Sequence, residues 1–335
     1  MKKVTMLLGL FLMIGWLAPL EGHSFDRPDP KTSAVLKALG ASPGGVGFVL
    51  LTAMAKVVKD TYPRVEITVV PGGFVGNIPR VDKGEGDLGS TTVDLCAMAE
   101  KKKEPFHDLQ IKNAMALLNV QNPFNYFVIV RKDLPVDTVG DLFTKKLPIR
   151  LCTLNKGTAT ELVYRNIFAA KGMTWGDISE KWKGRLSFVS WADAVNLIKD
   201  GHADGILAVG ADKIGWAMDL AHARQIKVLK WDKDILDMVR EKFGLGIGAL
   251  PANAFPGVDK DVVVPFSPCE VVVNRRVPGK VVHAILTAMQ EREKEFAATH
   301  SGLANFKAVN MAKNLGLPLH PAASEYYKAR NLPMK

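Results

Sequence analysis

Residues 65–73 read Val-Glu-Ile-Thr-Val-Val-Pro-Gly-Gly, and this stretch contains the unit from which the fold is built. The alternation and β-branching of residues 65–70 predict a strand. Pro71-Gly72-Gly73 predicts a turn, and residues 75–83 predict a helix. Strand, glycine-bearing turn and helix in this order are typical of a parallel sheet with right-handed crossovers.

The same unit occurs on both sides of this stretch. Upstream, residues 33–41 predict a strand, and residues 42–47 (Ser-Pro-Gly-Gly-Val-Gly) predict a turn into a helix that ends at Pro63. Downstream, residues 88–90 predict a short strand and residues 93–100 a helix. The upstream helix is indicated by an apolar face that contains Phe48, Leu51, Ala55 and Val58. Three such units indicate one α/β lobe.

A second series begins after residues 126–130, an apolar strand that is expected to leave the first lobe. Its predicted strands are 147–152, 186–189 and 205–210, with helices from Thr160 to Lys171 and from Trp191 onward. Residues 271–273 are expected to return the chain to the first lobe, before one helix over 278–300. Two crossings predict a hinge of two strands beside a cleft that closes on a ligand.

We therefore predict a two-lobed α/β fold, in which each lobe is a mostly parallel sheet flanked by helices and two hinge strands join the lobes. The predicted boundaries are 23–127 plus 268–335 for lobe 1 and 128–267 for lobe 2.

The N-terminus predicts export. Lys2 and Lys3 precede an uncharged run from Val4 to Leu20, which is typical of a signal peptide over residues 1–22. An uncleaved membrane anchor is the alternative, but the run is short and contains Gly15 and Pro19. We expect a periplasmic protein.

Charge and cysteine content exclude several classes. The net charge is +10, but the basic residues are scattered and form no basic-aromatic stripe, so nucleic acid is not expected as a partner. Cys96, Cys152 and Cys269 form no disulfide framework and are expected to be buried thiols. We find no zinc-ligand spacing, and we expect no metal and no cofactor.

The C-terminal region carries the most specific pattern. Residues 316–327 read Gly-Leu-Pro-Leu-His-Pro-Ala-Ala-Ser-Glu-Tyr-Tyr, which resembles the C-terminal signature of the TAXI family of solute-binding proteins, the extracytoplasmic receptors of one class of TRAP transporters. Further stretches resemble turns of that family in the same order, at residues 44–47, 71–77, 83–89, 157–160 and 200–205. The resemblance implies a type II-like periplasmic-binding-protein fold. It also implies a receptor that captures a small organic anion, such as a dicarboxylate or glutamate, and delivers it to TRAP membrane subunits.

Ligands of open α/β sheets bind beyond the carboxyl ends of the strands, where backbone N–H groups and helix N-termini favour anions. The candidates in lobe 1 are Ser42, Gly45, Val46, Gly47, Gly73, Phe74, Ser90 and Thr91. The candidates in lobe 2 are Asn155, Thr158, Thr160 and Trp191. Each candidate has an ordinary structural alternative. Thr158 and Glu161 have the spacing of a capping box, the glycines can supply the positive φ of tight turns, and a lone tryptophan is commonly a core residue.

Two departures from the family bear on the ligand. Phe74 and Gly76 stand where the family has Ser and Glu, and Phe74 can narrow the pocket or stack on a planar ligand. Asp212 lies where the family has a proline, and it either faces the cleft or caps the next helix. No arginine lies in the candidate turns to clamp a carboxylate.

Catalysis is the competing class. The histidines show no paired metal spacing, and no nucleophile elbow, Walker loop or dinucleotide fingerprint occurs. We expect a binding protein and a monomer. A receptor for an ABC importer or a sensor kinase and a periplasmic enzyme are the alternatives. We expect His320 to pin the tail by hydrogen bonds, and Tyr326 and Tyr327 to anchor it across the lobes.

Overall fold

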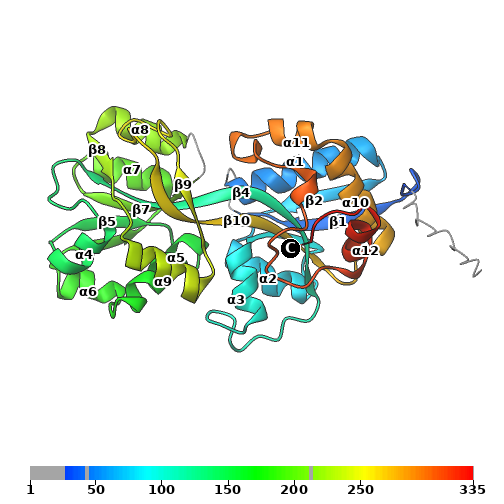
Figure 1. Ribbon diagram of the computed structural model, residues 1–335, viewed down its shortest axis with the longest axis horizontal. Coiled ribbons are helices and arrows are strands. Elements are labelled where there is room, and N and C mark those ends of the chain that lie inside the picture. The colour runs from blue at the N-terminus through cyan, green and yellow to red at the C-terminus, as the bar shows by residue number, and fades with distance from the viewer. Residues whose placement is uncertain (1–26, 42–44, 211–213, 335) are drawn as a thin grey trace, which may run out of the picture.

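The computed structural model describes residues 27–41, 45–210 and 214–334, which form two α/β lobes side by side (Figure 1). The two-lobed α/β fold predicted from the sequence is confirmed. The predicted signal peptide, Ser42 and Asp212 lie outside the described residues. Within the described part of the chain, no helix is long and apolar enough to cross a bilayer.

The first lobe is built from the repeated strand-turn-helix units near the N-terminus and from the C-terminal helices. Its elements are β1 (Ala34–Leu39), α1 (Val46–Thr61), β2 (Val65–Val70), α2 (Phe74–Asp82), β3 (Leu88–Thr92), α3 (Val93–Glu100), α10 (Gly279–Glu291), α11 (Glu293–Ala298), two 3-10 turns, η1 (Ser301–Leu303) and η2 (Ala308–Asn310), and α12 (Pro321–Ala329). The three strands are parallel in the order β2-β1-β3. Separate clusters of apolar side chains cover the two faces of this sheet.

The second lobe repeats the same design. Its elements are α4 (Val139–Lys145), β5 (Arg150–Thr153), α5 (Ala159–Ala170), α6 (Trp175–Glu180), β6 (Arg185–Phe188), α7 (Trp191–Lys199), β7 (Gly205–Gly210), α8 (Gly215–Ala223), β8 (Ile226–Val228), α9 (Lys233–Phe243) and β9 (Gly246–Leu250). The strands β7-β5-β6 are parallel. The sequence analysis did not find α4, α6, α8, α9, β8 or β9.

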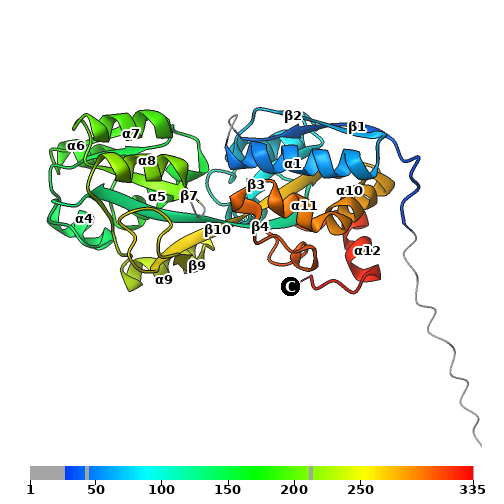
Figure 2. The ribbon, with the colours of Figure 1, turned by 90° about the horizontal axis from the view of Figure 1, so that it is seen from above.

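Two long strands, β4 (Ala114–Arg131) and β10 (Val262–Asn274), pass through both lobes (Figures 1 and 2). They pair antiparallel with each other and make one continuous sheet, in the order β2-β1-β3-β10-β4-β7-β5-β6. Both are longer than the predicted hinge segments 126–130 and 271–273. Polar residues and prolines within them, such as Asn122 and Pro268, conceal the strand pattern because such residues are depleted in strands.

Each lobe has its own apolar core. The core of the second lobe draws on residues 126–264, and the main core of the first lobe draws on residues 36–120 and 269–327. A further cluster joins Ala159 and Leu162 of α5 to apolar residues of α2 and α3, so the lobes touch on this face of the sheet. The boundaries 23–127 plus 268–335 and 128–267 remain a proposal, which the two main cores support.

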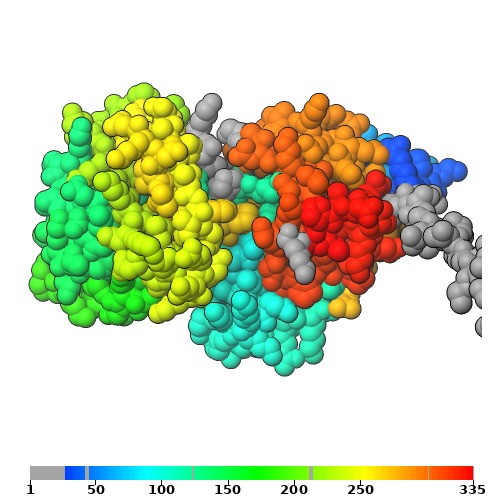
Figure 3. Space-filling model, viewed as in Figure 1, coloured from blue at the N-terminus to red at the C-terminus, as the bar shows by residue number. Residues whose placement is uncertain are grey.

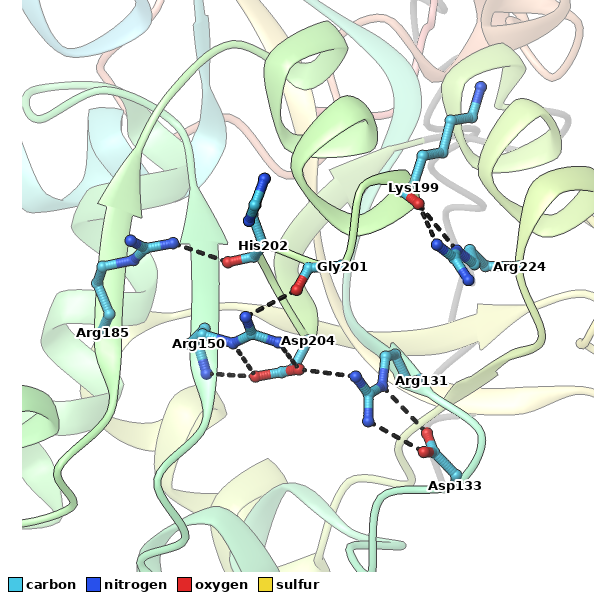
Figure 4. A network of polar contacts seen from close by, with 9 residues as sticks. All are labelled: Arg131, Asp133, Arg150, Arg185, Lys199, Gly201, His202, Asp204 and Arg224. Carbon is cyan, nitrogen blue, oxygen red and sulfur yellow. Dashed lines mark hydrogen bonds and ion pairs between the residues drawn. The ribbon is translucent and has the colours of Figure 1, made fainter.

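The amino-terminal edge of the second lobe is held by ion pairs (Figure 4). The carboxylate of Asp204 accepts hydrogen bonds from Nε and Nη2 of Arg150, at 2.9 and 2.6 Å, and lies 3.3 Å from Nη1 of Arg131. Burial opposes ionisation of Asp204, but the Arg150 hydrogen bonds outweigh it and lower the pKa of this carboxyl. The family-like segment 200–205 therefore ties the starts of β5 and β7 to the end of β4, at the edge opposite the hinge.

The predicted helix over 278–300 is wrong, because it is two helices, α10 and α11, that meet at Arg292. The backbone of Arg292 leaves helical geometry, with φ −109° and ψ 30°. Its guanidinium reaches back to α1, where Nε donates to the hydroxyl of Thr61 at 2.9 Å. Tertiary contact with α1 thus accompanies the break in an otherwise helical pattern.

The C-terminal signature packs on the first lobe alone, so the expectation that it crosses the lobes is wrong. Its backbone pairs with the start of β4, because the N–H of Ala116 donates to the carbonyl of Pro318 at 2.8 Å. The predicted pinning by His320 is confirmed: the buried ring accepts from the N–H of Ala322 at 3.2 Å and caps α12. Tyr327 is fully buried and donates to the carbonyl of Leu117 at 2.8 Å.

Candidate functional site

The carboxyl ends of the parallel strands of both lobes meet at the hinge. On β3, Thr92 lies opposite Cys269 of β10, and on β7, Gly210 lies opposite Asn125 of β4. Because the strands within each lobe are parallel, the turns after β1, β2 and β3 face the turns after β5, β6 and β7. Figure 3 shows a groove between the two lobes. This is the place where open α/β sheets bind ligands.

Four candidate residues of the first lobe lie together. A Cβ added at Gly47 would lie 2.3 Å from Cε1 of Phe74 and 2.7 Å from the hydroxyl of Ser90. The hydroxyl of Thr91 donates to the carbonyl of Phe74 at 3.0 Å. The glycine at position 47 is therefore required for close packing of the turn against α2 and β3. Phe74 packs edge-to-face on the hinge residue Phe124, with ring centroids 5.5 Å apart.

These turns are held by Asn77, a fully buried residue whose role the sequence analysis missed. Its Nδ2 donates to the carbonyls of Leu39, Gly40 and Ser90, at 3.0, 2.7 and 2.8 Å. Its Oδ1 accepts from the N–H of Gly73 at 3.0 Å, so this candidate amide is already occupied. The only signal in the sequence was its place in the family-like turn 71–77.

The side chains of Ser90 and Thr91 are fully buried, so in this conformation they support the turn from behind. The N-terminus of α1 is different. Its N-cap residue Gly45 has no side chain to cap the helix, and its carbonyl accepts from the N–H groups of Phe48 and Val49. Among the described residues, no acceptor contacts the N–H groups of Val46 and Gly47. N–H groups in the first turn of a helix are those that can bind an anion, and Gly47 is buried whereas Val46 is partly exposed.

In the second lobe, Thr158 is the N-cap of α5, which is the structural alternative raised for it, although its own N–H donates to the carbonyl of Asn155 and does not complete a capping box with Glu161. Its hydroxyl accepts from the N–H of Glu161 at 3.3 Å and donates to the carbonyl of Asn155 at 2.9 Å. Glu161 in turn accepts from the N–H of Gly157 at 3.3 Å. The hydroxyl of Thr158 is thus engaged within its own turn. Thr160 is buried near the contact between the lobes, whereas Asn155 is exposed.

Trp191 belongs to a stack of three rings. It lies 4.9 Å from the centroid of Trp216 with 11° between the ring planes, and Trp216 lies 6.2 Å from Phe127 at 13°. Phe127 is fully buried on β4, whereas Trp191 and Trp216 are half-buried. Trp191 is thus half-buried and packs against the apolar core of the second lobe, so the core alternative and a ligand contact both stay open for it.

Buried polar groups concentrate on the hinge strands and beside them. Asp94, which follows β3, is buried, accepts from the hydroxyl of Ser267, and has its pKa raised by burial. Glu270 is fully buried, and burial raises its pKa to about 8. One of its oxygens accepts from the N–H of Gly316 at 2.8 Å. The other has no hydrogen-bond partner among the described residues, and the same is true of both amide atoms of Asn122 and of Nδ2 of Asn125.

A cation lies at the same edge of the second lobe. The Nζ of Lys156 stands 5.0 Å from the ring centroid of Phe188, and the side chain has no carboxylate partner among the described residues. The sequence analysis considered only arginine and missed this lysine. The described residues bring together no group of three or more metal-binding side chains.

Solved structures similar to this chain include two whose titles name a binding protein. The periplasmic aliphatic sulphonate binding protein SsuA from Escherichia coli has a TM-score of 0.46 and 14% identity, over 89% of this chain and 79% of that chain. A TctC solute binding protein from Polaromonas has a TM-score of 0.45 and 16% identity, over 89% and 98%. XAC2383 from Xanthomonas citri, bound to chloride ion, has a TM-score of 0.48 and 13% identity, over 89% and 99%. Because these TM-scores and sequence identities are low, what the titles say applies to those proteins and not to this chain.

A family model carries more weight because it matches nearly the whole chain. The match extends over residues 39–330, from the end of β1 through α12, and so includes both lobes and the signature segment. This chain belongs to the NMT1-like family.

Proposed function

We propose that the protein is the periplasmic solute-binding receptor of a TRAP transporter. It captures a small organic anion, a dicarboxylate or an amino acid such as glutamate, in the cleft between the lobes. The closed receptor then delivers the ligand to the membrane subunits of the transporter. The assignment to a TRAP transporter rests on the TAXI-like signature at residues 316–327 and on the family-like turns upstream.

The binding function is supported mainly by one observation: the carboxyl ends of the parallel strands of both lobes lie at the hinge. Each lobe directs the carboxyl ends of three parallel strands toward the other lobe. The N–H groups of Val46 and Gly47, which no acceptor contacts among the described residues, begin a helix of 16 residues, and Lys156 lies in the turn after β5 of the other lobe. Both groups favour an anion. We propose the candidate residues of the sequence analysis as this site, with Ser90, Thr91, Thr158 and Thr160 in supporting positions.

A receptor for an ABC importer is the second candidate. The family model that matches is described as NMT1-like, and this description does not name TRAP transporters. The architecture serves either kind of transporter, because both need a two-lobed protein that closes on its ligand. A sensor kinase as partner and a periplasmic enzyme are the remaining alternatives.

A thermal-shift screen of the purified protein against organic acids and amino acids tests the proposal. A ligand that binds only the native state raises the melting temperature by mass action, by an amount that grows with its concentration. Saturable binding with the ligand recovered unchanged is the expected result. Conversion of the bound compound would favour an enzyme, and no shift with any solute would refute the receptor. Co-purification with TRAP or with ABC membrane subunits separates the two transport classes.

A further inference from the structure

The stacked rings of Trp191, Trp216 and Phe127 lead from the core of the second lobe to the cleft. Phe127 is fully buried and also contacts Phe255, with centroids 5.8 Å apart. Among the described residues, no ring contact joins Trp191 directly to Phe127, and both lie nearly parallel to Trp216. Trp216 therefore lies between the other two rings, and Trp191 ends the stack.

The position of this stack places it at the ligand edge. Trp191 is the first residue of α7, directly after the turn that leaves β6, and Trp216 lies in the first turn of α8 after β7. Both are therefore at the carboxyl ends of the strands. A half-buried tryptophan pair that is fixed from below by a core phenylalanine is a rigid flat surface. Such a surface costs little conformational entropy when a planar group stacks on it.

A second observation at the base of the cleft also indicates a ligand. Asn125 is 2% exposed, and its Nδ2 has no hydrogen-bond partner among the described residues. It lies two residues before Phe127 on β4, so its side chain is on the same face of the strand as the ring stack. A buried donor without a partner is costly unless a bound group satisfies it.

The first lobe places anion-binding N–H groups, at the N-terminus of α1, on the same side of the sheet as the ring stack. In Figure 1, α1 of the first lobe and α7 and α8 of the second lobe lie on the upper side, and α2, α3 and α5 lie on the lower side. On the lower side the lobes are already in contact through Ala159 and Leu162. The first turn of α1, with the N–H groups of Val46 and Gly47 that no acceptor contacts among the described residues, thus shares the upper side with the ring stack.

We propose that the ligand is a planar carboxylate, whose aromatic or conjugated ring stacks on Trp191 while its carboxylate binds the N-terminus of α1. This rests on the proposed function and narrows its ligand class from organic anions in general to flat ones. The ring would add a stacking energy that an aliphatic dicarboxylate lacks. The carboxylate would accept from the amides of Val46 and Gly47, and Asn125 would donate to the ligand from the hinge.

Benzoate and cyclohexanecarboxylate are a matched pair for the test, because they share charge and carbon count and differ in planarity and π-electrons. Titrations of the purified protein are followed by tryptophan fluorescence and calorimetry, with 2-naphthoate as a larger ring and with succinate and glutamate as aliphatic anions. The expected result is that benzoate or 2-naphthoate binds about three- to tenfold more tightly than cyclohexanecarboxylate, which is the range of one aromatic stacking interaction.

Two variants examine the residue itself. Trp191→Leu keeps an apolar side chain and removes the π-face, and it should weaken binding of the aromatic acids about three- to tenfold while leaving cyclohexanecarboxylate unchanged. Met218→Ala changes an exposed apolar residue of α8 and serves as the control, with unchanged affinity expected. Urea unfolding of each variant separates a folding defect from a binding defect.

The outcomes separate the proposal of a planar ligand from the proposed receptor function on which it rests. If succinate or glutamate binds and neither aromatic acid does, the planar ligand class is overturned and the receptor stands. Equal affinity of Trp191→Leu and wild type for the aromatic acids also overturns it. If none of these anions binds, the planar ligand class is overturned, and the thermal-shift screen against organic acids and amino acids decides whether the receptor function stands.

Discussion

Replacing Glu270 with glutamine should make the protein more stable at alkaline pH and remove part of its pH dependence. Glu270 lies on the hinge strand β10, is fully buried, and has a pKa raised by burial to about 8. In the unfolded chain, the pKa of a glutamate is about 4.3. Between these two values the native state holds a proton that the unfolded state has released. The free energy of unfolding therefore falls as the pH rises through this window.

The magnitude follows from the two pKa values. One pKa unit corresponds to about 1.4 kcal/mol, so the contribution of this group should fall by a few kcal/mol, roughly 3 to 4, between pH 5 and pH 8. Glutamine is neutral at every pH and keeps an oxygen that can accept from the N–H of Gly316, a bond of 2.8 Å in the native protein. The variant should therefore lose that decline, and its advantage over wild type should increase with pH.

Urea unfolding at pH 5, 6, 7 and 8, followed by circular dichroism, measures this difference. The exposed residue Glu100, at the end of α3, provides the control Glu100→Gln, which should leave the slope unchanged. Comparison with wild type at each pH cancels the contributions of other groups, such as His320. Parallel curves for wild type and Glu270→Gln across this range would refute the argument, because they would mean that Glu270 titrates alike in both states.

Three further substitutions test the supports of the cleft and of the fold. Asn77→Ala leaves three buried carbonyls without their donor and should cost about 3 kcal/mol in urea unfolding, and a loss below about 1 kcal/mol would contradict its bracing role. Thr158→Val removes the cap of α5, so it should lower the free energy of unfolding by about 1 kcal/mol and weaken ligand binding. Thr158→Ser keeps the hydroxyl and should restore both stability and affinity. Unchanged affinity in the valine variant would remove Thr158 from the site. Asp204→Asn breaks ion pairs at the edge opposite the hinge and should cost about 2 kcal/mol at pH 7 without changing ligand affinity, as thermal shift with and without ligand would show. Since the pKa of Asp204 is lowered in the native state, that loss should disappear as the pH falls through this lowered value.

The fold was predictable because the strand-turn-helix unit is local. Residues 65–73 contain their strand and turn within one continuous segment, and β2 forms over the predicted residues 65–70. The hinge strands were not fully predictable, because their central residues are polar or proline. Asn119, Asn122 and Asn125 are buried on β4, whose partner strands β10 and β7 are distant in sequence, and no local pattern indicates that burial.

The candidate site was predictable as a set of turns, whereas the role of each side chain was not. The spacing of Thr158 and Glu161 was enough to predict a cap, since capping is local. The stacking of Trp191 on Trp216 depends on the contact between α7 and α8, which are separated in sequence by a strand. Asn77 likewise bonds residues up to 38 positions away, so its bracing role could not be derived from its neighbours in sequence.

The most direct test of the central claim is small-angle X-ray scattering of the purified protein with and without a saturating ligand from the thermal-shift screen. A receptor that closes about β4 and β10 should become more compact when the ligand bridges the lobes, so its radius of gyration should fall. Tryptophan fluorescence recorded on the same samples confirms saturation. Identical scattering profiles for the free and the saturated protein would contradict closure about this hinge.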